Sequence, residues 1–155
     1  MIAAGLYDWL LFAHILTAMV WLGGGVVLAA LAVATLRGGD AAGVVRFVGS
    51  LRTIGPAVLA PATVATLGLG IWLVLQSAAW DFGQTWVLIA LGLFVAALAV
   101  GAGHQGRAAI KAQAAIEGDD HAEARRQLVR WAWGYALVVA LLVLVAWDMV
   151  FKPGL

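Results

Sequence analysis

The sequence predicts an all-α membrane protein, a bundle of four transmembrane helices in one integral membrane domain, residues 1–155, with both termini on the outer side. Two observations predict this class. Apolar residues make up 65% of the chain and charged residues only 11%, whereas a water-soluble domain needs far more charge on its surface. The charges also gather in clusters separated by long uncharged runs, for which lipid is the suitable solvent.

Four uncharged runs are long enough to span the membrane. About 20 residues of helix cross roughly 30 Å of hydrocarbon, and the shortest run, residues 131–147, is near the lower limit. With extensions into water, the predicted helices cover residues 7–36, 54–78, 84–114 and 120–151. Pro56 and Pro61 should bend the second helix, because proline cannot donate the helical hydrogen bond.

The cations set the predicted orientation. Eight of the nine Lys and Arg residues fall between the first and second helices or between the third and fourth. Positive charge marks the cytoplasmic side, so the opposite side, which holds both termini, is predicted to be outside. The charges expected there are Asp8, Asp81, Asp148 and Lys152. The aromatic belt expected at that interface consists of Tyr7, Trp9, Trp80, Trp86 and Trp147.

The two basic segments carry structure of their own. Four apolar residues recur at helical spacing in the first segment, Val44, Val45, Val48 and Leu51. This pattern predicts a short amphipathic helix that lies on the inner leaflet. In the second segment, Asp120 followed by Glu123 predicts the capped start of the fourth helix.

His14 is the clearest polar residue inside a predicted span. It shares a helical face with Thr17, Ala18, Trp21 and Gly25. A histidine in hydrocarbon should face the interior of the bundle and find a partner there. Two roles follow. His14 is either a structural residue bonded to Gln84 or to a backbone carbonyl, or a ligand of a haem iron or a copper ion.

Three consecutive glycines, residues 23–25, leave the first helix thin at mid-membrane. The ordinary interpretation is close packing of neighbouring helices, and the functional one is room for a flat cofactor. In the functional case, the candidate cofactor contacts are His14, Trp21, Gly24 and Gly25, and His14 is also the candidate metal ligand. The chain has no cysteine, which excludes disulfides, thiolate metal sites and iron–sulfur clusters.

His104 is not expected to be a second ligand. It lies at the cytoplasmic end of the third helix, which runs in the same direction as the first. His14 and His104 should therefore be roughly 20 Å apart along the membrane normal, whereas a ligating histidine nitrogen lies about 2 Å from its metal. We expect His104 to cap its helix or to contact lipid headgroups.

Several short runs resemble a known group of membrane proteins. They are HILTAMVWLGGG from His14 to Gly25, then Gly106-Arg107, Arg130-Trp131 and Lys152-Pro153. Over nearly the whole chain they resemble CopD-type copper-resistance membrane domains, HemJ-type protoporphyrinogen oxidases and a related uncharacterised family of small integral membrane proteins. The resemblance implies a multi-pass protein of the bacterial inner membrane. It gives His14 the position of the histidine that ligates haem b in the HemJ type and that contributes to copper handling in the CopD type.

The sequence departs from the HemJ pattern at one position. HemJ-type proteins carry a lysine early in the third helix, and the segment from Thr85 to Phe94 has none, with Leu91 near its place. The resemblance therefore does not imply protoporphyrinogen oxidation, and it leaves open whether the chain is an enzyme. We expect the chain to belong to the uncharacterised family of this group.

Three functions remain open on the sequence. The first is redox chemistry or handling of haem b through His14. The second is copper transfer with Met149 or Asp148 beside His14, since thioether ligands suit Cu(I). The third is a non-catalytic membrane subunit that binds lipid or a partner helix through its small-residue faces. The expected partners are membrane lipids and a homodimer or larger membrane complex, and not nucleic acid.

The orientation yields a first prediction. Because eight of the nine cations lie in the two segments assigned to the cytoplasm, a topology reporter fused after Leu155 should be active only on the outer side. Paired fusions of alkaline phosphatase and green fluorescent protein measure this. Activity of the cytoplasmic reporter alone would overturn the orientation.

Overall fold

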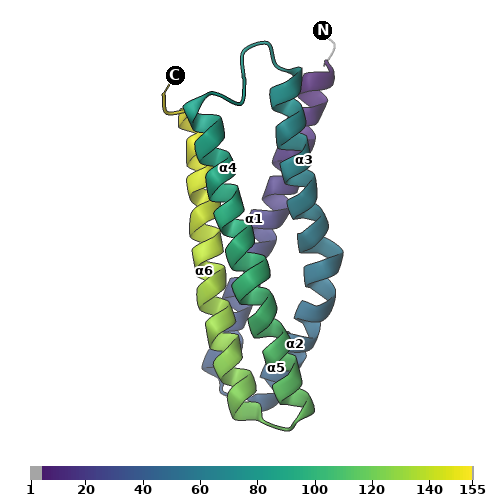
Figure 1. The fold of residues 1–155 in the computed structure, drawn as a ribbon. Helices are drawn as coiled ribbons and strands as arrows, with labels where there is room; N and C mark the ends of the chain where they lie inside the picture. Colours follow the sequence, from purple (N-terminus) through teal and green to yellow (C-terminus); the bar gives the residue numbers. More distant parts are fainter. Residues whose placement is uncertain (1–4, 155) are drawn as a thin grey trace.

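The structure is a computed structural model that describes residues 5–154, and all of its regular elements in that range are helical (Figure 1). The first and fourth rods are α1 (Leu6–Gly38) and α6 (His121–Phe151). The second rod joins α2 (Ala41–Ile54), the π-helical turn η1 (Gly55–Leu59) and α3 (Ala60–Gln76). The third joins α4 (Thr85–Leu98), η2 (Ala99–Gln105) and α5 (Gly106–Glu117).

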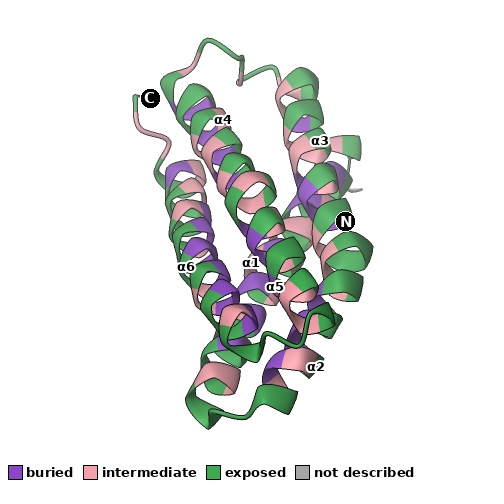
Figure 2. Cartoon of the chain, turned by 60° about the horizontal axis from the view of Figure 1, so that its bottom comes forward, coloured by how far each residue is buried: buried purple, intermediate pink, exposed green. Residues whose placement is uncertain are grey.

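The four rods confirm the predicted fold class. Within residues 5–154, each of the four is long and apolar enough to cross a membrane. Only 22–28% of their most apolar 18-residue windows is buried in the protein, so most of this apolar surface faces outward, as a lipid-exposed surface would. Figure 2 shows exposed residues along the outward faces of all the helices. Both ends of the chain lie at the same end of the bundle (Figure 1).

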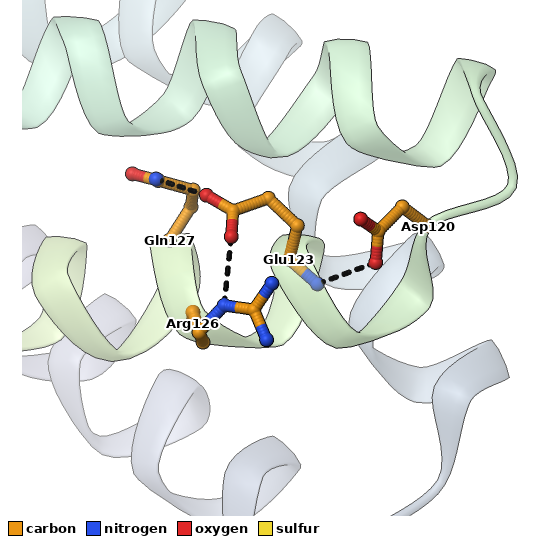
Figure 3. Close-up of polar contacts among 4 residues, drawn as sticks. All are labelled: Asp120, Glu123, Arg126 and Gln127. Atoms are coloured by element: carbon orange, nitrogen blue, oxygen red, sulfur yellow. Dashed lines mark hydrogen bonds and ion pairs between the residues drawn. The ribbon is translucent and has the colours of Figure 1, made fainter.

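Short polar signals set the helix boundaries. α1 ends at Gly39, whose φ of 68° is a left-handed conformation that favours glycine. Asp120 caps α6 by accepting a hydrogen bond from the backbone N–H of Glu123 at 2.9 Å, as the sequence predicted. The Glu123 side chain then binds Arg126 and Gln127 on the same helix (Figure 3).

The predicted amphipathic helix in the first basic segment exists, but its surroundings differ from the prediction. α2 continues through η1 into α3 as one rod and is not a separate helix. Its apolar face is buried in the protein, with Val48 2% exposed, and packs with α1, α5 and α6. An apolar face contacts whichever apolar surface is near, and here that surface belongs to the bundle. Arg46 remains on the exposed side.

The two predicted prolines fall at the wide turn of the second rod. Pro56 lies within η1, and Pro61 occupies the first turn of α3. In this π-helical turn the N–H of Ala60 donates to the carbonyl of Gly55, five residues earlier. The wider turn accommodates proline, which has no N–H to donate. The structure thus has a π turn where the sequence predicts a bend.

The helices pack as an open chain of neighbours. α3 packs on α1, α1 on α6, and α6 on α4, but α3 makes no close backbone contact with α4 or α6. At the end that carries the termini, α1 and α3 stand apart from α4 and α6 (Figure 1). At the opposite end, a core that includes Leu28, Phe47, Leu128 and Trp131 joins α1, α2, α5 and α6, and thus all four rods.

A matched pair of glycines tests this packing. A Cβ added at Gly25 would lie 2.5 Å from Cε1 of the buried Tyr135, whereas one added at Gly23 meets nothing within 4 Å. Gly25→Ala should therefore destabilise the protein by about 1–3 kcal/mol through overpacking. Gly23→Ala should be neutral or slightly stabilising, because alanine is the better helix former. Thermal unfolding in detergent measures both, and equal stability of the two variants would contradict the α1–α6 contact.

Candidate functional site

A cavity of about 560 Å³ lies between the two pairs of helices at the end that carries the termini. Residues of α1, α3, α4, α6 and the α3–α4 connection line it, and most of them are apolar. Exposed apolar side chains belong to its lining, among them Met19 of α1 at 65% exposure and Val150 of α6 at 74%. In a membrane, a cavity with such a rim opens sideways into hydrocarbon.

His14 lies in the wall of this cavity and is 9% exposed. Its Nδ1 is 2.9 Å from the backbone carbonyl oxygen of Thr66 on α3. The imidazole approaches α3 closely because residue 70 is glycine, where an added Cβ would lie 3.1 Å from Cε1 of His14. A backbone carbonyl is thus the partner of His14, while Gln84 bonds to Ala79 and Trp86 instead.

This hydrogen bond determines which imidazole nitrogen is free. A carbonyl oxygen only accepts, so Nδ1 carries the proton and donates it, and Nε2 of the neutral ring keeps its lone pair. Nε2 has no hydrogen-bond partner within residues 5–154 and is not a fully enclosed atom. Metal-ligating histidines have this arrangement, with one nitrogen bonded to a carbonyl and the other directed to the metal. The donor chemistry of His14 therefore fits an axial ligand.

The other predicted cofactor contacts separate into two groups. Trp21 lines the cavity and packs edge-to-face on Phe94, with their ring centroids 5.0 Å apart. Gly24 and Gly25 face the side chains of Leu59 and Tyr135 and do not line the cavity. The structure thus brings His14 and Trp21 together, and it places the two glycines where α1 packs against its neighbours.

His104 lies away from the cavity. Its Nε2 is 3.1 Å from the backbone carbonyl of Arg130, and its ring packs on Gly134 of α6. It is not part of the cavity lining, in accord with the expected separation from His14. Within residues 5–154, no three His, Asp or Glu side chains come together as a metal-binding group.

The mouth of the cavity, at the end of the bundle that carries the termini, contains an aromatic cluster with a cation, a combination that the sequence did not predict. Nε1 of Trp80 donates to the hydroxyl of Tyr7 at 3.3 Å, and the rings of Trp80 and Trp86 pack edge-to-face at 5.4 Å. Nζ of Lys152 lies 4.5 Å from the centroid of Trp80. These residues come from both ends and the middle of the chain, so no local spacing could reveal their contact.

Asp148 lies in the last turn of α6, at the end of the bundle that carries the termini. The sequence predicts a charge at this end but not its burial, and in the structure Asp148 is 1% exposed. Neither carboxylate oxygen has a hydrogen-bond partner within residues 5–154. Gly134 faces the third rod, and Asp148 follows it by two heptads, so both lie on the same face of α6. This spacing is the sequence signal that could have predicted the burial of Asp148. It does not line the cavity beside His14.

Comparison with known proteins gives one family. Residues 8–153 match a family model described as "Predicted integral membrane protein (DUF2269)". No curated protein matches the chain, and no solved structure does.

Asp148 gives a test of the buried face of α6. An unpartnered buried polar group costs about 1–3 kcal/mol, and a charged carboxylate costs more. Asp148→Asn should therefore raise the thermal unfolding temperature in detergent at neutral pH. The exposed carboxylate of Asp119 is the control, because Asp119→Asn should change stability by less than about 0.5 kcal/mol. A large loss of stability in Asp148→Asn would show that this carboxylate has a stabilising partner in the folded protein.

Proposed function

The chain belongs to the DUF2269 family of predicted integral membrane proteins, and we propose that it binds haem b within the membrane, with Nε2 of His14 as an axial ligand. One observation carries the proposal. Nδ1 of His14 donates to the carbonyl of Thr66, which leaves the lone pair of Nε2 free at the wall of a cavity.

The size and lining of the cavity support this ligand. A volume of about 560 Å³ falls within the range of about 300–1,000 Å³ typical of small-molecule and cofactor sites. The walls are apolar and include the rings of Trp21 and Phe94, which suit the flat faces of a macrocycle. The run from His14 to Gly25 that resembles the HemJ-type and CopD-type proteins adds further support.

The residues of the chain would position the cofactor and control its surroundings. The carbonyl of Thr66 orients the His14 ring and makes Nε2 more basic. The apolar walls exclude water, and this low polarity tunes the potential of a bound metal. Haem b itself would supply one-electron chemistry. No second histidine lines the described cavity, so His14 would be the one imidazole that holds the haem in the proposal.

Copper is the alternative that a specific observation favours. Met149 lines the same cavity as His14, and a thioether with an imidazole is a ligand pair that suits Cu(I). Asp148, the other ligand considered from the sequence, does not line the cavity. A subunit that binds only lipid is the third alternative, and metal and haem analysis of one purified sample separates all three.

The proposal predicts a visible spectrum that depends on His14. Protein purified from haem-replete cells should show a Soret band. His14→Ala should abolish or strongly shift it, because the ligand is lost. His104→Ala is the matched control and should leave the band nearly unchanged, since His104 bonds to Arg130 outside the cavity. Equal loss in both variants would overturn the assignment of His14 as the ligand within the cavity. Folded protein without any Soret band would overturn haem binding, and copper without a Soret band would favour the alternative.

The number of haems per chain, measured on the same sample, tests the proposed site further. His14 faces a cavity formed within one chain, so the proposal expects one haem per chain, high-spin iron and ready binding of carbon monoxide. One low-spin haem per two chains would instead show that the His14 residues of two parallel chains share the iron, and it would contradict the single-chain site.

A further inference from the structure

We propose that the mouth of the cavity binds the carboxylate of an amphiphilic ligand, which pairs with Nζ of Lys152 while its apolar body occupies the cavity. The shared ligand chemistry is a carboxylate on a large apolar body, and either a haem propionate or a long-chain fatty acid can supply it. The inference deepens the proposed function where the ligand is haem, but it does not require iron or His14.

The backbone directs Lys152 to the mouth. Lys152 follows the last turn of α6 with a φ of 43°, a left-handed conformation that a non-glycine residue rarely adopts. Its N–H still donates to the carbonyl of Asp148 at 2.8 Å. This turn carries Nζ to 4.5 Å from the ring centroid of Trp80 and 5.7 Å from that of Trp86, so the ammonium lies beside the α3–α4 connection.

Lys152 gives the mouth a positive charge. It is the one charged residue in the described lining of the cavity, and the other eight cations lie in the two basic segments. Within residues 5–154 it forms no ion pair with a carboxylate, although Asp148 is one helical turn away. The aromatic faces attract the ammonium but do not neutralise it, so its N–H donors remain available to an anion.

Tyr7 provides a second donor at the same place. Its hydroxyl oxygen accepts a hydrogen bond from Nε1 of Trp80 at 3.3 Å, so the hydroxyl proton is free to donate elsewhere. Tyr7 and Lys152 both line the cavity. A cation and a hydroxyl donor at one mouth match the two acceptor oxygens of a carboxylate.

The rest of the cavity suits the apolar body of the ligand. Most residues of its walls are apolar, and the lining includes the exposed side chains of Met19 and Val150. A ligand dissolved in the membrane can therefore enter sideways without crossing water. Tryptophan and lysine side chains mark the membrane interface, so the carboxylate would remain at its usual depth while the apolar body enters the protein.

Quenching of tryptophan fluorescence by a nitroxide-labelled fatty acid tests the site in detergent-solubilised full-length protein. The probes are 12-doxylstearic acid and its methyl ester, which differ only in the charge of the head. The acid should bind the wild-type protein about tenfold more tightly than the ester, because only the acid pairs with the ammonium of Lys152. Lys152→Met should remove this preference and leave binding of the ester unchanged.

Two further variants make the test specific. Lys152→Arg keeps the charge and should retain most of the preference for the acid. Lys111→Met removes an exposed cation outside the cavity and should retain all of it. Circular dichroism and size-exclusion chromatography establish that each variant is folded.

In a second experiment, haem or haem dimethyl ester is titrated into the protein, and the Soret band measures binding. Preference for free haem that Lys152→Met removes supports the inference with haem as the source of the carboxylate, even if the fatty acid does not bind. Preference for the fatty acid without a Soret band overturns haem binding but supports the carboxylate site. The inference is overturned if neither acid is preferred over its ester, if Lys152→Met keeps the preference, or if phosphatidylglycerol binds through Lys152 and neither acid does.

Discussion

A polar group inside hydrocarbon has no water to bond, so it must find its partner within the protein. This constraint makes the spans helical, and it extends to side chains. Thr63 and Thr66 each donate to a carbonyl four residues earlier in the second rod, and Nδ1 of His14 donates to the carbonyl of Thr66. Satisfying that one nitrogen leaves the other free, so the candidate site is a direct consequence of the constraint.

The cavity arises because the two ends of the bundle pack differently. At the basic end, α2 and α5 add their apolar faces to the core, and Tyr135 packs against Gly25. At the other end, the second and third rods are too far apart for their backbones to touch. Lipid can cover apolar helices as well as protein can, so a membrane bundle can keep one end open without exposing that surface to water.

Two charged residues at this end of the bundle, Lys152 and Asp148, lie in different surroundings. Lys152 lies over the rings of Trp80 and Trp86, while the carboxylate of Asp148, one turn earlier, is buried without a partner within residues 5–154. Opposite charges at this spacing commonly pair on a helix. Their separation here leaves the cation at the cavity and the acid inside the bundle, which is the arrangement from which an anion site is inferred.

The sequence by itself determined the number of helices, their approximate limits and the Asp120 cap, because length, charge and capping are local properties. It also placed His14 inside a span. Tertiary structure alone decided that Thr66 is its partner, that Gly24 and Gly25 pack against side chains, that the apolar face of α2 is buried, and that Asp148 lies inside. In a membrane helix the lipid-facing and protein-facing sides are equally apolar, so periodicity does not show which side turns inward, and only the packing of distant segments settles it.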